Sequence, residues 1–79
     1  MYITYILQSQ SNQKYYIGYT EDLEQRLSRH NRGLVRSTKS GTPWRVIYTE
    51  KFNTKSEAYK REQQIKSYKG GEAFKSLIG

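Results

Sequence analysis

The sequence predicts an α+β fold, in which helices flank a three-stranded antiparallel sheet. Three observations predict it: two short β-type runs near the N-terminus, a third run in the middle of the chain, and helix-capping patterns after the second and third runs. The expected order is strand, strand, helix, strand, helix, with a short helical segment at the C-terminus. The 79 residues allow one domain, which we expect to span 1–79.

The three strands are predicted from runs rich in β-branched and aromatic residues. Residues 2–7 form the first run and residues 15–20 the second, and the connection between them is short and polar, which is typical of an antiparallel hairpin. Residues 44–52 form the third run, and Pro43 marks its start.

Capping residues place the first helix. Asp22 with Gln25 forms a weak capping box, Leu23 and Leu27 recur at helical spacing, and Gly33 is placed to end the helix after residue 31. The following residues, 34–43, are polar and basic, and we expect them to form a flexible loop.

A second capping box places the second helix. Thr54 with Glu57 matches the Thr-x-x-Glu pattern, and the helix is expected to run to about residue 66 or 68. The pair Gly70-Gly71 ends it, and residues 72–78 are expected to form one last helical segment.

Charge and composition narrow the function. Fourteen Lys and Arg against seven Asp and Glu give a net charge of +7, which favours a polyanionic partner such as nucleic acid, although solubility alone is the alternative explanation. The absence of cysteine excludes disulfides and thiolate chemistry, and a single histidine does not make a usual zinc site. No signal peptide and no membrane-spanning run is present, so we expect a cytoplasmic protein without a membrane partner.

Three polar residues fall on or beside helix faces that should be apolar. His30 lies within the stripe made by Leu23 and Leu27, and Arg26 borders it. Glu62 shares the face that should pack on the sheet. Each has a structural explanation: a satisfied core histidine, an arginine that reaches solvent from the helix edge, and an ion pair between Glu62 and Arg26.

Together these residues suit phosphate chemistry. An arginine fork matches phosphate oxygens and stabilises charge that develops on them. Mg²⁺ often uses one or two protein carboxylates together with a substrate phosphate, so Glu62 alone suffices to recruit it. A tyrosine has a pKa near 10, so nearby positive charge is needed before it can act as a base.

The order of these residues resembles the GIY-YIG nuclease domain. The second signature element is present as Tyr16-Ile17-Gly18, whereas Ile3-Thr4-Tyr5 keeps only the tyrosine of the first. The run Y-I-G-Y-T-x-D-L-x-x-R-x-x-x-H-N covers residues 16–31, and Ala58, Glu62 and Lys66 match the A-x-x-x-E-x-x-x-K helix of the family. The resemblance is closest to small free-standing bacterial members that consist of this domain alone.

The resemblance implies an endonuclease that hydrolyses phosphodiester bonds with one divalent ion, Mg²⁺ or Mn²⁺. Related domains cut DNA in homing endonucleases, restriction enzymes and the excision-repair nuclease, so DNA is favoured over RNA, in repair or recombination. By carry-over, Glu62 holds the metal, Arg26 stabilises the phosphate, Tyr5 and Tyr16 position or deprotonate the attacking water, and His30 assists proton transfer. Of the two tyrosines, we expect Tyr5 to be the base.

The chain departs from the larger nucleases in two ways. It has no Asn about a dozen residues beyond Glu62, where Lys66 or Lys75 is a substitute phosphate contact, and it has no separate DNA-binding domain. We therefore expect weak cleavage, action on unusual DNA structures, or dependence on a partner.

Two alternatives to a nuclease stay open. The first is a nucleic-acid-binding module without catalysis, and the second is a protein-interaction domain that uses its basic face on an acidic partner. In either nucleic-acid function, phosphate contacts are expected from a basic rim around the cleft, made by Arg29, Arg32, Arg36, Lys39 and Arg45, together with Lys66.

Overall fold

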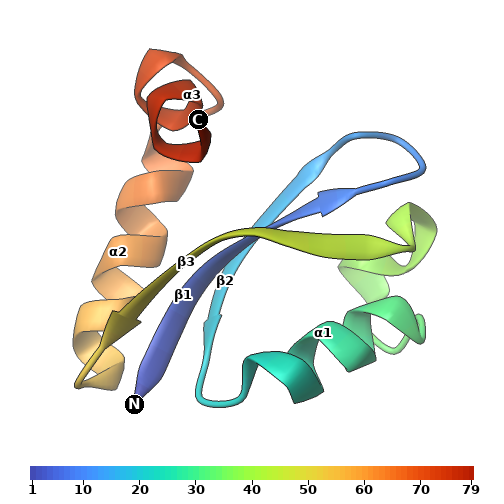
Figure 1. The fold of residues 1–79 in the computed structure, drawn as a ribbon, viewed down its shortest axis with the longest axis horizontal. Helices are drawn as coiled ribbons and strands as arrows, with labels where there is room; N and C mark the ends of the chain where they lie inside the picture. The colour runs from blue at the N-terminus through green and yellow to red at the C-terminus, as the bar shows by residue number, and fades with distance from the viewer.

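The computed structural model describes residues 1–79 and contains one antiparallel sheet of three strands. The sheet order is β2-β1-β3, so β1 is central and β2 is an edge strand (Figure 1). Tyr5 of β1 lies opposite Gly18 of β2 and Thr49 of β3. The predicted α+β class and element order are confirmed, and the strands are β1 (Tyr2–Ser9), β2 (Tyr15–Thr20) and β3 (Trp44–Phe52).

The helices begin at the predicted caps. The Asp22 side chain accepts a hydrogen bond from the Gln25 amide, and the Thr54 hydroxyl accepts one from the Glu57 amide. The helices are α1 (Leu23–Asn31), α2 (Lys55–Ser67) and α3 (Glu72–Ile78). Each is too short or too polar to cross a bilayer as a helical span.

The basic segment between α1 and β3 differs from the expected flexible loop. Residues Arg36–Gly41 form a 3₁₀ helix, η1. The indole Nε1 of Trp44 donates to the carbonyl of Thr38 at 2.8 Å, and the Ser9 hydroxyl donates to the carbonyl of Gly41 at 2.6 Å. The loop is ordered because its backbone carbonyls bond to buried side chains of the sheet, a contact that composition alone does not reveal.

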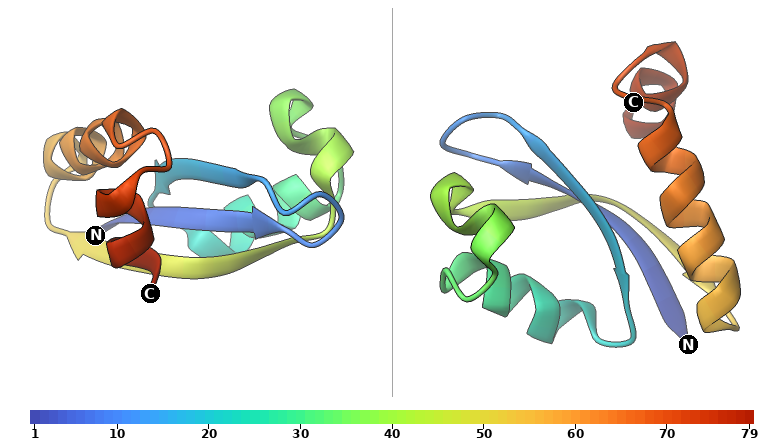
Figure 2. Two further views of the ribbon diagram at one scale, coloured as in Figure 1. Left: turned by 90° about the horizontal axis from the view of Figure 1, so that it is seen from above. Right: turned by 180° about the vertical axis from the view of Figure 1, so that it is seen from behind.

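Each face of the sheet carries its own small core. On one face, Tyr5 and Leu7 of β1 pack with Trp44 and with the half-buried Leu23 and Leu27 of α1. On the other face, a second cluster is made by Ile6 of β1, Ile65 of α2 and Phe74 of α3. Strand alternation produces this division, because neighbouring residues of β1 point to opposite faces. The helices α1 and α2 consequently lie on opposite sides of the sheet (Figures 1 and 2).

Candidate active site

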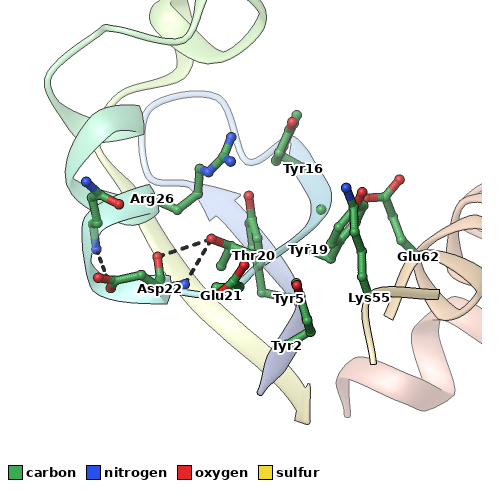
Figure 3. Close-up of a pocket in the computed structure, with 12 residues that line it drawn as sticks. Tyr2, Tyr5, Tyr16, Tyr19, Thr20, Glu21, Asp22, Arg26, Lys55 and Glu62 are labelled. Atoms are coloured by element: carbon green, nitrogen blue, oxygen red, sulfur yellow. Dashed lines mark hydrogen bonds between the residues drawn. The ribbon is translucent and has the colours of Figure 1, made fainter. Parts of the chain in front are cut away.

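A cleft of about 710 Å³ opens at the edge strand β2. Because β2 has no further strand beside it, side chains from both faces of the sheet reach the same space. Figure 3 shows Arg26 on the α1 side and Lys55 and Glu62 on the α2 side, with tyrosines between them. The cleft is lined by Tyr2, Tyr5, Tyr16, Gly18, Tyr19, Thr20, Glu21, Asp22, Gln25, Arg26, Lys55 and Glu62.

Tyr5 forms the floor of the cleft and depends on the glycine opposite it. The residue is 1% exposed. A Cβ atom placed on Gly18 would lie 2.7 Å from Tyr5 Oη and 2.9 Å from its Cζ, and 3.2 Å from a ring carbon of Tyr16. The third residue of the Tyr16-Ile17-Gly18 element is therefore a glycine for a steric reason: the phenol ring occupies the space of a side chain.

His30 lies behind the tyrosines and is completely buried. Its Nε2 is 3.3 Å from Tyr5 Oη, and its Nδ1 is 2.7 Å from Thr38 Oγ1. The imidazole ring centre lies 4.8 Å from that of Tyr16. His30 does not line the cleft, and it is hydrogen-bonded to a residue that does, Tyr5.

The surroundings of His30 and Tyr5 favour their neutral forms. Burial lowers the pKa of His30, and the positive charges of Arg26 and Arg29 lower it further. Burial also raises the pKa of Tyr5, with further increases from Tyr16 and Glu62 that outweigh the opposing effect of Arg26. Arg26 supplies the positive charge that a tyrosine base needs, but burial outweighs its effect on the Tyr5 pKa, so Tyr5 needs a proton acceptor beside it.

Glu62 is 7% exposed and is oriented by two neighbours on α2. Its Oε2 accepts from Lys66 Nζ and from Gln63 Nε2, both at 3.0 Å. The alternative of an ion pair with Arg26 is wrong, because the i,i+4 neighbour Lys66 takes that place. Both of these contacts are made by Oε2, and Oε1 has no hydrogen-bond partner. Because Glu62 lines the cleft, its carboxylate keeps one free oxygen there.

This donor set fits a single hard divalent cation. The structure has no group of three or more acidic or histidine side chains that could enclose a metal. Mg²⁺ is commonly held by one or two carboxylates, with water and a substrate phosphate completing its shell. The free Oε1 of Glu62 meets that requirement.

The basic residues divide into two groups. Arg26 lines the cleft, but the five cations expected at its rim do not. They are exposed and make no ion pair, and they lie on α1, on η1, between these two elements, and at the start of β3: Arg29, Arg32, Arg36, Lys39 and Arg45.

Lys55 lines the cleft and was not among the expected site residues. It precedes Glu62 by seven positions, which is two helical turns, so the two side chains share a helix face. That spacing was the available signal in the sequence. It was not decisive, because many surface lysines share a face with a glutamate.

Comparison with known proteins identifies the family to which this chain belongs. Residues 1–73 match the family model of the GIY-YIG catalytic domain. The chain therefore belongs to the GIY-YIG family, which is a nuclease family.

The relatives are small proteins. UPF0213 proteins of Staphylococcus saprophyticus and Staphylococcus aureus are each 46% identical over 54 residues, which is 67% of this chain. The aligned segment spans 66% of the length of these relatives. The solution structure of a UPF0213 protein from Bacillus halodurans is 29% identical, with a TM-score of 0.55, and the match covers 99% of this chain and 82% of that one.

The contact between Gly18 and Tyr5 generates a stability prediction. Gly18→Ala should lower the free energy of unfolding by about 1–3 kcal/mol, because the new methyl group overlaps a buried ring. Urea unfolding measures the change, with Ser28→Ala at an exposed position of α1 as the control. Equal unfolding midpoints for Gly18→Ala and the wild type would contradict the steric explanation.

The lowered pKa of His30 generates a pH prediction. An unfolded histidine takes up a proton near pH 6.5, whereas folded His30 resists protonation, so the unfolded state gains protons first as the pH falls. The free energy of unfolding should therefore decrease from about pH 7.5 to about pH 5, and less steeply in His30→Gln. Urea titrations across this range measure both slopes, and identical slopes would refute the prediction.

Proposed function

We propose that this protein is a metal-dependent endonuclease that hydrolyses phosphodiester bonds in DNA. The observation that carries the proposal is the contact between Tyr5 and His30 at the floor of the cleft, with Arg26 on one wall and Glu62 on the other. These groups supply a proton acceptor, a phosphate ligand and a metal ligand around one space.

The contact between Tyr5 and His30 supports a proton path. Because the pKa of Tyr5 is raised, its phenolate is not available in advance of the reaction. Because the pKa of His30 is lowered, the imidazole is neutral before the reaction, and it takes the proton of Tyr5 only as Tyr5 takes one from the water. Tyr5 Oη takes a proton from the attacking water while its own proton passes to His30 Nε2. The water oxygen bonds to phosphorus, and the P–O bond to the leaving oxygen breaks with its electron pair on that oxygen. The leaving oxygen takes up a proton from solvent, and His30 returns its proton to solvent through Tyr5.

Arg26 is suited to hold the phosphate during this step. A guanidinium donates paired hydrogen bonds to phosphate oxygens and stabilises the charge that grows on them. Tyr16 lines the cleft beside Tyr5, with the two ring centres 6.4 Å apart, and its hydroxyl positions the water or the phosphate.

Glu62 would hold Mg²⁺ or Mn²⁺ through its free Oε1. When bound, the ion supplies positive charge at the phosphate and the leaving oxygen. Lys66 and Gln63 fix the carboxylate through Oε2, which orients the other oxygen. Lys66 would therefore both orient the Glu62 carboxylate and place a positive charge near the substrate phosphate.

The exposed cations outside the cleft would extend the contact along the DNA backbone. Arg29, Arg32, Arg36, Lys39 and Arg45 carry no ion pair, so their charges are available to phosphates. We expect a cytoplasmic enzyme of modest affinity that acts on the DNA structures of repair or recombination.

The same cations favour one second candidate, a nucleic-acid-binding module without catalysis. Their free charges support binding to phosphates whether or not the residues of the cleft catalyse cleavage. Binding by the wild type that weakens with salt, and no cleavage with either metal, would favour this candidate.

Replacing Glu62 tests the metal site. Glu62→Gln keeps the size of the side chain and removes the charge that recruits the ion, so cleavage should fall by about 100-fold or more, equal to roughly 2.7 kcal/mol of barrier. Labelled branched, flapped, single-stranded and duplex DNA are incubated with Mg²⁺, Mn²⁺ or a chelator, and binding is scored by gel shift.

Glu24→Gln is the matched control, because it removes an equal charge from an exposed position of α1. It should cleave like the wild type. Unchanged cleavage by Glu62→Gln would contradict the metal-binding function of Glu62.

A further inference from the structure

The proton path ends at a histidine whose second nitrogen has its own buried partner. Thr38, in η1, is 2% exposed, and its Oγ1 lies 2.7 Å from His30 Nδ1. Neither Thr38 nor His30 lines the cleft. The contact therefore acts on His30 alone.

The second neighbour of the Thr38 hydroxyl favours one direction for this bond. A hydroxyl has one hydrogen, and the carbonyl oxygen of Val35, which lies 3.3 Å from Thr38 Oγ1, can only accept it. A hydroxyl that donates to Val35 accepts from the ring, and Nδ1 then carries the hydrogen of the neutral imidazole. The lone pair is left on Nε2, 3.3 Å from Tyr5 Oη.

We propose that Thr38 is a positioning residue that holds His30 in the Nδ1–H tautomer, with Nε2 free to accept the proton of Tyr5. The opposite tautomer would place a hydrogen between Nε2 and Tyr5, and no further proton could pass to the neutral ring. The tautomer is a property of the folded chain, whereas its effect on cleavage rests on the proposed function.

The surrounding contacts hold Thr38 in place. The indole Nε1 of Trp44 donates to the Thr38 carbonyl at 2.8 Å. Asn31, the residue after His30, accepts from the backbone amide of Trp44 and donates to its carbonyl at 3.0 Å. Gly41 lies against the Trp44 indole, where a Cβ atom would overlap the ring. The 3₁₀ segment is thus tied to the residue that follows the histidine.

The tautomer can be read directly, because the chain has one histidine. A long-range ¹H–¹⁵N correlation spectrum of the uniformly ¹⁵N-labelled protein, recorded where the ring is neutral, distinguishes a protonated ring nitrogen from an unprotonated one. We expect Nδ1 to be protonated and Nε2 unprotonated. A wild-type spectrum of the Nε2–H form would overturn the proposal.

Two substitutions separate the hydroxyl from the shape of the side chain. Thr38→Val keeps the shape and removes the acceptor, so the Nε2–H form should become populated. Thr38→Ser keeps the acceptor and should retain the Nδ1–H form. Circular dichroism and urea unfolding establish that both variants are folded, and a wild-type tautomer in folded Thr38→Val would overturn the function of Thr38.

Cleavage kinetics test the consequence. For Thr38→Val, kcat should fall by about tenfold or more while KM stays within about twofold, and Thr38→Ser should recover most of the loss. A folded Thr38→Val with wild-type kcat would overturn the positioning role. If the wild type does not cleave DNA under any condition, the proposed function fails, and the spectra still decide the tautomer.

Discussion

The rest of the site depends on the contact between the Tyr5 ring and Gly18. Because Gly18 has no side chain, the phenol lies across the neighbouring strand, and its hydroxyl reaches both the cleft and the buried His30. His30 in turn contacts Thr38, and Trp44 bonds to the Thr38 carbonyl. Contacts thus connect Tyr5 at the cleft floor with the 3₁₀ segment. A larger residue at position 18 would displace the Tyr5 ring, on which these contacts depend.

The position of β2 at the sheet edge explains how so small a chain gathers a site. Each face has only a thin core, one beneath α1 and the other beneath α2 and α3. At the free edge, Arg26 from one face and Glu62 from the other open into one cleft. The two helices therefore bring opposite charges to the same space without pairing them with each other, because Glu62 is bonded to Lys66 instead. A guanidinium and a carboxylate that do not pair with each other are suited to bind a phosphate and a metal ion side by side.

Local sequence signals predicted the strands, the caps and the helices, because alternation and capping act over a few residues. The buried polar residues were also visible: His30 and Glu62 fall on faces that should be apolar, and both are buried. Contacts between distant segments were not visible. The order of η1 depends on Trp44 and Ser9, and the inclusion of Lys55 in the cleft depends on how α2 packs against β2. Arg26 was the one ion-pair partner considered for Glu62, and the i,i+4 neighbour Lys66 was overlooked although its spacing was visible in the sequence.

The most direct test of the central claim is metal-dependent cleavage of labelled DNA by Tyr5→Phe, compared with the wild type and with Tyr16→Phe. Tyr5→Phe keeps the ring against Gly18 and removes only the oxygen that joins the cleft to His30. The proton path predicts a folded protein that still binds DNA and whose cleavage falls by about 100-fold or more. Cleavage by folded Tyr5→Phe at the wild-type rate would contradict it, since no proton could then reach His30 from the cleft.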